Sequence, residues 1–344
     1  MDSNQKSTQP LVSIVLNSFN TSKFIGEQIS SILAQTYTNL ELIVCDDCST
    51  DQTAEIVRGF MQKDSRVKWL QNDRNLGKGN MNRGICLTFQ RGFDLSRGEL
   101  IALSDADDFW LPNKIQLQVE YLQAHPEINL VFTDSTVANK DLSVKMGSFQ
   151  QRLGNSLSGG FVTIDSILER NLPPGHVLLF RRALLKKLPP VPDGFSNDSW
   201  VDLVGTLNAP LGYMSEQTVL YRQHEGNASS ANMRDLSYYF KRFNEPDFLQ
   251  YYYKDKSCQM TGHKVLLTRE PSDAARKALT EKVANQTVLL EVLYAKNFLQ
   301  FVSRLFSAFW AILSTGQKYH LKQLGFLALS WGAIRKLKFD SQKI

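Results

Sequence analysis

The stretch Leu100-Ile101-Ala102-Leu103-Ser104-Asp105-Ala106-Asp107-Asp108 joins a short apolar run to three carboxylates within four positions. Such a run, bounded by polar residues, is typical of a buried strand. Carboxylates at its end cannot all be desolvated without partners, because each would cost several kcal/mol or take up a proton. A divalent cation prefers oxygen ligands and often brings phosphate oxygens with it. The alternative interpretation is a solvated acidic turn that caps the next helix.

The flanking segments alternate between strand and helix patterns. Apolar strands are expected at 11–16, 40–45, 67–70, 100–103 and 130–133, with helices at 25–33, 54–60, 81–93 and after Pro112. This alternation predicts an α/β fold, with a doubly wound, mostly parallel sheet and helices on both faces. The carboxyl ends of parallel strands share one rim and bind ligands there. Acids gathered on one rim repel one another without a cation, which favours a metal–phosphate site.

The composition is that of a globular protein whose basic character lies at one end. The chain has 344 residues, 42% hydrophobic and 21% charged, and a formal net charge of +5. From Val292 onward, eight Lys and Arg residues face one Asp, so the rest of the chain is slightly acidic. Neither a G-x-G-x-x-G nor a P-loop pattern occurs, which argues against a dinucleotide-dependent oxidoreductase or a P-loop NTPase. Cys45-Asp46-Asp47-Cys48 has no second pair nearby, so free thiols in a reducing compartment are expected.

Several motifs follow one another in order along residues 11–231. They lie at 12–16 with Asn20, 31–37, 41–51, 75–77 and 104–114, and then at 131–134, 181–184, 197–200 and 220–224. The first five resemble family 2 glycosyltransferases of the GT-A fold, and the later four are similar to the rhamnosyltransferase-like branch. The resemblance implies an inverting, metal-dependent enzyme of the hexosyltransferase type (EC 2.4). It would move a single sugar from a nucleotide-sugar donor, dTDP-rhamnose or a UDP-sugar, to a glycan acceptor in cell-surface polysaccharide biosynthesis.

The resemblance also implies a donor site. Asp47 would accept a hydrogen bond from the donor base, and Asn17 and Phe19 would wall the base pocket. Asp105 and Asp107 match the family's D-x-D motif. Asp107 would ligate Mg²⁺ or Mn²⁺ at the diphosphate, while Asp105 would hold the ribose or a water on the metal. A metal is suited to this place because it neutralises a diphosphate leaving group without a proton.

Roles on the acceptor side follow in the same way. Asp198 would take the proton of the acceptor hydroxyl, with Asp202 as the fallback, although an N-cap is the alternative interpretation of Asp198. His224 would be a further metal ligand or, alternatively, a structural histidine. Four more residues could contact phosphate or acceptor: Asp108, Arg222, Trp110 and Trp200.

Three parts are predicted along the chain. Residues 1–10 would be a disordered N-terminus, and 11–231 the GT-A domain, divided into a nucleotide-sugar half (11–140) and an acceptor half (141–231). Residues 232–344 would be a helical, basic extension. Apolar stripes with basic flanks between 298 and 338 suit either docking on a membrane surface or packing on the catalytic domain.

The expected surroundings follow from these parts. We expect a cytoplasmic protein, at the inner face of the plasma membrane if the extension docks there, acting on a lipid-linked glycan. No nucleic-acid recognition motif accompanies the basic charge, so no nucleic-acid partner is expected. The rival hypothesis is a non-catalytic nucleotide- or glycan-binding scaffold subunit of a polysaccharide assembly complex. A scaffold has no need of Asp105, Asp107 and Asp198 together, which argues against it.

Overall fold

The computed structural model describes residues 9–77, 80–155, 157, 159–170, 173–227 and 246–293. These residues form two compact units, one holding the ten-stranded sheet and the other holding α9 (Pro246–Leu267) and α10 (Asp273–Leu293). Most of the predicted disordered N-terminus, and all of the basic segment between 298 and 338, lie outside the described residues. Within the described ranges, no helix has both the length and the apolarity needed to cross a bilayer.

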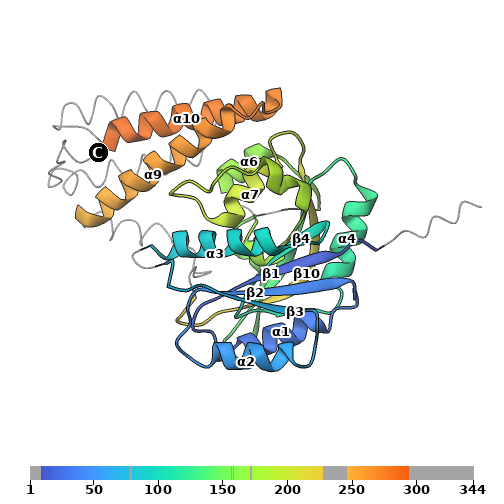
Figure 1. The fold of residues 1–344 in the computed structure, drawn as a ribbon. Helices are drawn as coiled ribbons and strands as arrows, with labels where there is room; N and C mark the ends of the chain where they lie inside the picture. Colours follow the sequence, from blue (N-terminus) through green and yellow to red (C-terminus); the bar gives the residue numbers. More distant parts are fainter. Residues whose placement is uncertain are drawn as a thin grey trace, which may run out of the picture. The chain divides into compact units, whose positions relative to one another are not determined.

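The first half of the sheet is parallel and matches the predicted alternation. Its order is β3-β2-β1-β4, and α1 and α2 cover one face while α3 covers the other (Figure 1). The strands and helices are β1 (Val12–Ser18), α1 (Ile25–Leu33), β2 (Leu40–Asp46), α2 (Thr53–Met61), β3 (Val67–Gln71), α3 (Met81–Leu95) and β4 (Leu100–Asp105). Strands β1, β2 and β4 are buried almost throughout, as expected of strands covered on both faces. The α/β fold class is therefore confirmed.

The second half of the sheet contains both parallel and antiparallel pairs. Only β10 pairs with β6 in parallel; β9 lies antiparallel between β4 and β6, and β5, β7 and β8 are antiparallel additions. These four strands have two to four residues each, and short connections can join antiparallel neighbours without the crossover that a parallel pair needs. The elements are β5 (Phe109–Trp110), α4 (Lys114–Ala124), β6 (Leu130–Ala138), β7 (Lys145–Ser148), α5 (Phe149–Arg152), β8 (Gly160–Val162), α6 (Ile164–Arg170), η1 (Gly175–Val177), β9 (Leu178–Arg181), η2 (Arg182–Lys187), α7 (Asn197–Gly205) and β10 (Leu211–Arg222).

One glycine lets α3 approach the sheet closely. A Cβ at Gly92 would lie 2.3 Å from Val15 Cγ1 and 2.8 Å from Cys45 Sγ, so any larger residue would push the helix away. Cys45 is fully buried under this contact, and burial raises the pKa of its thiol to about 12. It is a core residue near the end of β2. The close packing fixes α3, whose first turn reaches the rim where the parallel strands end.

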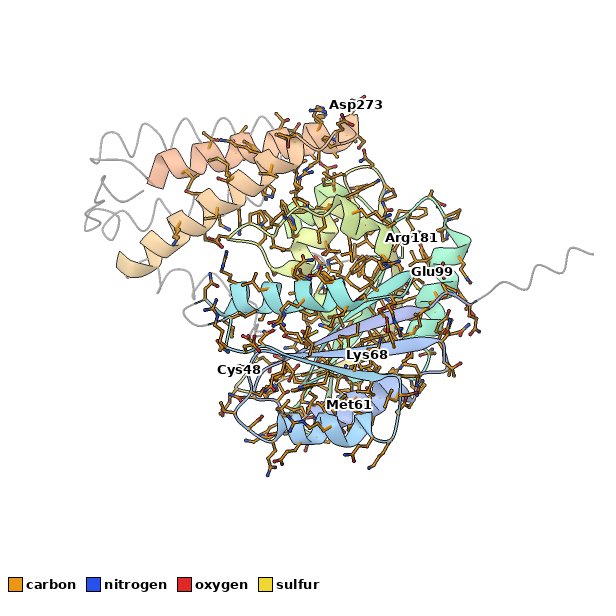
Figure 2. All side chains as sticks on the ribbon, viewed as in Figure 1. Cys48, Met61, Lys68, Glu99, Arg181 and Asp273 are labelled. Atoms are coloured by element: carbon orange, nitrogen blue, oxygen red, sulfur yellow. The ribbon has the colours of Figure 1, made fainter. Side chains whose placement is uncertain are left out.

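The two rims of the sheet are distinguished by their side chains. In Figure 2, Cys48, which follows β2, and Glu99, which precedes β4, lie at opposite ends of the strands. The carboxyl-end rim, marked by Cys48, carries the residues that the sequence analysis assigns to the donor. At the other end, Glu41 of β2 is 3% exposed and receives hydrogen bonds from Ser13 Oγ and Arg97 N, besides ion pairs with Lys68 and Arg97.

Glu41 should make the stability of the protein depend on pH. Burial alone would raise its pKa, but hydrogen bonds from Lys68, Ser13 and Arg97 outweigh burial and lower the pKa to about 2 from the usual 4.5. A lowered pKa stabilises the folded state above the unfolded-state pKa, and this stability is lost as the pH falls from about 4.5 towards 2. We expect Glu41→Gln to reduce the free energy of unfolding by about 2–3 kcal/mol at pH 7, measured by urea denaturation.

The difference between Glu41→Gln and the wild type should shrink steadily below pH 4.5. The exposed Glu120, on α4, provides the matched control, since Glu120→Gln should change stability by less than about 0.5 kcal/mol. A difference that stays constant down to pH 3 would contradict the low pKa of Glu41.

Candidate active site

A pocket of about 360 Å³ opens at the carboxyl-end rim of the parallel strands. It is lined by the ends of β1, β2 and β4, by the start of α3 and by the turn that follows β10. Its residues are Asn17, Ser18, Phe19, Thr21, Asp47, Asn75, Gly77, Met81, Ile85, Asp105, Ala106, Asp107, Tyr221, Gly226 and Asn227. Five residues that the sequence analysis assigns to the donor or metal therefore border one cavity: Asn17, Phe19, Asp47, Asp105 and Asp107.

Asp47 forms the buried floor of the pocket. Its side chain accepts hydrogen bonds at Oδ1 from Asn72 Nδ2 (2.8 Å) and Leu76 N (2.7 Å), and at Oδ2 from Gly77 N (3.1 Å). A carboxylate oxygen can accept two hydrogen bonds, so Oδ2 keeps one acceptor position for a ligand. Phe19, 49% exposed, offers a ring face at the pocket wall. The arrangement suits a flat ring with a hydrogen-bond donor on its edge.

Asp107 and His224 lie against each other, as expected if both serve one site. Asp107 Oδ2 is 3.0 Å from His224 Nε2, and the ring of His224 stacks on Phe24 with centroids 4.5 Å apart. His224 Nδ1 accepts a hydrogen bond from Gly226 N, so the neutral ring carries its proton on Nε2 and donates it to Asp107. His224 orients Asp107 in this arrangement. Direct metal ligation through Nε2 would require the other tautomer and the loss of the Gly226 contact.

A second group of potential ligands lies beside the first. Asp105 Oδ2 and Asp108 Oδ2 are each 3.9 Å from His176 Nδ1, and one ligand atom from each of the three residues lies within 4.8 Å of the others. Burial, followed by repulsion from Asp107 and Asp105, raises the pKa of Asp108 well above its usual range. Burial, then Asp107 and Asp198, likewise raise the pKa of Asp105. This Asp-Asp-His group could hold a metal ion.

Arg222 is buried inside the protein, so a direct phosphate contact is not supported. Its side chain is 3% exposed; Nε donates to Asp107 O (2.7 Å), and the two terminal nitrogens donate to Lys140 O and Glu27. Its backbone N donates to Asp108 Oδ1 at 3.1 Å. Arg222 therefore fixes the strand-end loop that carries the carboxylates, and the loop in turn places Asp107 at the pocket.

The two tryptophans and Asp108 are also too buried to contact a substrate. Trp110 is 1% exposed and its ring lies 4.0 Å from the Nζ of Lys114, while Trp200 is 0% exposed and donates from Nε1 to Pro189 O. Asp108 is 0% exposed. Stacking of either indole on a sugar ring is incompatible with this packing, so both serve the core.

Asp198 lies in the first turn of α7, after the N-cap residue Ser196. Its Oδ2 accepts a hydrogen bond from Gly175 N at 2.9 Å. Its charge contributes to the raised pKa of Asp105. It is partly exposed, whereas Asp202, one turn later, is 0% exposed with neither oxygen hydrogen-bonded among the described residues. Burial and the nearby Asp198 raise the pKa of Asp202 well above normal, which favours its neutral form. Asp202 is therefore poorly suited as an accessible base.

Two residues near the site, His176 and Lys114, were not predicted from the sequence. His176 precedes β9 and joins the strand-end acids only because β9 inserts beside β4. Lys114 is fully buried at the start of α4, and burial lowers its pKa to about 7. Lys114 and Trp110 belong to the same motif at 104–114 and lie four residues apart, so their contact could have been suspected from the sequence. No local pattern relates His176 to Asp105, so its place could not be found without the sheet order.

Comparisons with known proteins agree with this geometry. The profile of glycosyl transferase family 2 matches residues 13–188. An uncharacterized glycosyltransferase of Nostoc sp. is 28% identical over 225 residues, covering 63% of this chain and 66% of the relative. The UDP-Glc:alpha-D-GlcNAc-diphosphoundecaprenol beta-1,3-glucosyltransferase WfgD of Escherichia coli is 34% identical over 162 residues, covering 47% and 54%. The match thus spans less than two thirds of the length of either relative.

A solved structure also shares the fold. S. aureus TarS 1-349, crystallised in complex with UDP-GlcNAc, aligns with a TM-score of 0.56 at 16% identity, covering 95% of this chain and 93% of that one. An identity this low supports the architecture alone. Because the family profile covers more than half of the 344 residues and its segment contains the pocket's strand ends, the assignment rests on both sequence and structure. This chain belongs to glycosyl transferase family 2.

Proposed function

We propose that this protein is an inverting, metal-dependent glycosyltransferase that transfers one sugar from a nucleotide-sugar donor to a glycan acceptor in cell-surface polysaccharide biosynthesis. The observation that carries the proposal is the single pocket bordered by Asp47, Asp105 and Asp107 at the carboxyl ends of parallel strands. Family membership supports the same chemistry. We assign residues 11–231 to the glycosyltransferase domain and 232–344 to its extension.

The free acceptor position on Asp47 Oδ2 supports a base that presents an N–H to it. Uracil and thymine carry a donor at N3, whereas cytosine has an acceptor there and would be repelled by a carboxylate. Guanine also carries a ring N–H, so the choice of a UDP- or dTDP-sugar as the donor rests on the relatives as well as on this hydrogen bond. The E. coli relative is named for UDP-Glc, which favours UDP, while the rhamnosyltransferase-like motifs favour dTDP-rhamnose.

The diphosphate would lie towards Asp107, at the other side of the pocket from Asp47. The residues fit a divalent ion here, because the Asp107 carboxylate borders the cavity beside His224, and Arg222 fixes the backbone of Asp107 by donating to its carbonyl oxygen. A bound Mg²⁺ or Mn²⁺ would neutralise the leaving diphosphate. Asp105, beside Asp107, would then hold the ribose, and Asp198 would accept the proton of the attacking acceptor hydroxyl as the anomeric configuration inverts.

A lipid-linked acceptor is the natural substrate class for such a protein. The name of the E. coli relative specifies a sugar linked through diphosphate to undecaprenol. We propose an acceptor of that class for this chain, with transfer at the cytoplasmic face of the plasma membrane. The basic extension would hold the protein at that surface, and membrane docking of the extension is part of this proposal.

Nucleotide binding tests the proposal most directly. Thermal unfolding should be followed with UDP, dTDP, GDP and CDP, each with and without Mn²⁺. We expect UDP or dTDP to raise the midpoint in the presence of Mn²⁺ and CDP to leave it unchanged, because ligands that bind only the folded state stabilise it. Asp47→Asn should abolish the rise, since an amide can turn a donor towards the base.

An exposed residue on another loop supplies the control. Asp141→Asn, between β6 and β7, should respond to nucleotide as the wild type does. Equal responses to UDP and CDP would overturn the role of Asp47. Absence of any response would favour a glycan-binding scaffold over the enzyme.

A further inference from the structure

We propose that Asp105, Asp108 and His176 bind a divalent transition-metal ion at a site separate from Asp107. The three residues come from two segments that lie far apart in the sequence, the end of β4 with the loop after it and the turn η1 before β9. Their potential ligand atoms converge within 4.8 Å. The proposal rests on the proposed function only in sharing Asp105, whose Oδ2 would ligate the ion while Oδ1 would hold the ribose, and it does not depend on the identity of the donor.

Asp108 supplies the first independent observation. Its side chain is 0% exposed, Oδ1 accepts from Arg222 N, and Oδ2 has no hydrogen-bond partner within the described ranges. That oxygen points to the space it shares with His176 Nδ1 and Asp105 Oδ2. A buried carboxylate oxygen without a partner is costly, and a positive ion bound there would offset its desolvation.

His176 is held as a metal-binding histidine would be. Its ring stacks on Tyr221 with centroids 4.6 Å apart and planes 4° from parallel, and Phe149 meets its edge. Nε2 lies 3.1 Å from Ser135 Oγ, which can accept its proton and leave the lone pair of Nδ1 directed at the two carboxylates. Ligating histidines commonly donate their other N–H to such a partner, which fixes the tautomer and the ring orientation.

The ligand atoms would move closer together around an ion. Oxygen and nitrogen ligands at about 2.0–2.2 Å from a metal lie roughly 3.0–3.4 Å from each other. The observed 3.9 Å between His176 Nδ1 and each carboxylate oxygen would shorten by about 0.5–0.9 Å. Two carboxylates and an imidazole favour Mn²⁺ or Zn²⁺ over Mg²⁺, because imidazole is a poor ligand for the harder ion.

An ion here would also organise the acceptor side of the site. His176 lies next to Gly175, whose N–H holds Asp198 Oδ2 at 2.9 Å. Binding would tie this turn to the end of β4 and so fix the distance between Asp198 and the donor carboxylates. The ion would position the base that the proposed function requires.

Nucleotide-free Mn²⁺ binding to the full-length chain tests the site. Equilibrium dialysis should give one tightly bound Mn²⁺ per wild-type chain, and Mg²⁺ should compete poorly. Asp108→Asn, which keeps the Oδ1 acceptor for Arg222, and His176→Gln should each weaken binding at least about tenfold. Asp202→Asn, the matched change at another buried acid, should leave binding within about threefold of wild type. Asp107→Asn should weaken binding less than Asp108→Asn or His176→Gln does, because Asp107 contributes charge to the site but no ligand.

The nitrogen ligand has a spectroscopic signature that a folding defect would not reproduce. Electron spin-echo modulation of the bound Mn²⁺ should show a ¹⁴N coupling that persists in His224→Gln and disappears in His176→Gln. Wild-type binding by both Asp108→Asn and His176→Gln would overturn the proposal. So would loss of the ion in Asp107→Asn, because that result would place the ion at the donor site. If His176→Gln does not fold, the ¹⁴N coupling in His224→Gln decides the case, because that variant keeps His176 and removes the other histidine near the carboxylates.

Discussion

Replacing Asp107 by Ala is expected to lower the rate of sugar transfer at least about a thousandfold while leaving the protein folded. Asp107 borders the pocket, and Arg222 fixes the loop that carries it. Its loss removes the acidic ligand for the ion that would neutralise the leaving diphosphate. Arg222 donates to the backbone oxygen of residue 107, so that contact survives the substitution.

Initial rates measured with radiolabelled donor and a lipid-linked acceptor pool would determine the size of the loss. Asp141→Ala removes an exposed carboxylate from a loop that does not line the pocket, and should keep the wild-type rate. The melting temperatures of both variants should stay near that of the wild type. Retention of more than about a tenth of the wild-type rate by Asp107→Ala would disprove the metal-binding role.

The parallel half of the fold could be predicted because its signals are local. Each of β1, β2 and β4 is an apolar run that ends in polar residues, and parallel strands bring those ends to one rim. The convergence of Asn17, Asp47, Asp105 and Asp107 on one pocket follows from that rule. The D-x-D motif indicates what Asp105 and Asp107 could do, but the alternation of strands and helices predicts where they lie.

The antiparallel half could not be predicted, because its strands are short and their partners are distant in sequence. The pattern of β9 alone does not reveal that it inserts between β4 and β6, and only that insertion brings His176 to Asp105 and Asp108.

The same limitation explains why the burial of Arg222 could not be predicted. Next to a histidine at a strand end, an arginine suggests a phosphate ligand, yet Glu27 of α1 and the loop carbonyls take up its donors. A buried pairing of this kind depends on which helix covers the strand end, and sequence spacing contains no such information.

Asp198→Asn should separate catalysis from donor binding. General-base catalysis contributes about 10²–10⁴-fold to such reactions, so we expect a loss of transfer in that range with little change in nucleotide affinity. The carboxylate lies at the start of α7, held by Gly175 N, and it is not among the residues that line the donor pocket. Calorimetric titration with UDP and Mn²⁺, beside initial rates, measures the two quantities independently.

The neighbouring acid in the same helix provides the control. Asp202→Asn replaces a carboxyl group that burial already keeps towards its neutral form, so it should alter neither the rate nor the melting temperature substantially. If Asp202→Asn lost activity and Asp198→Asn kept it, the roles would be reversed, and the buried acid would have to reach the acceptor through a movement of α7. If both variants retained the full rate, inversion would need a base from elsewhere on the rim.

Asp198→Glu distinguishes a catalytic base from a helix N-cap, because a longer carboxylate can still accept a proton after its contact with Gly175 is lost. Partial activity in Asp198→Glu together with inactivity in Asp198→Asn would establish that the proton acceptor itself is required.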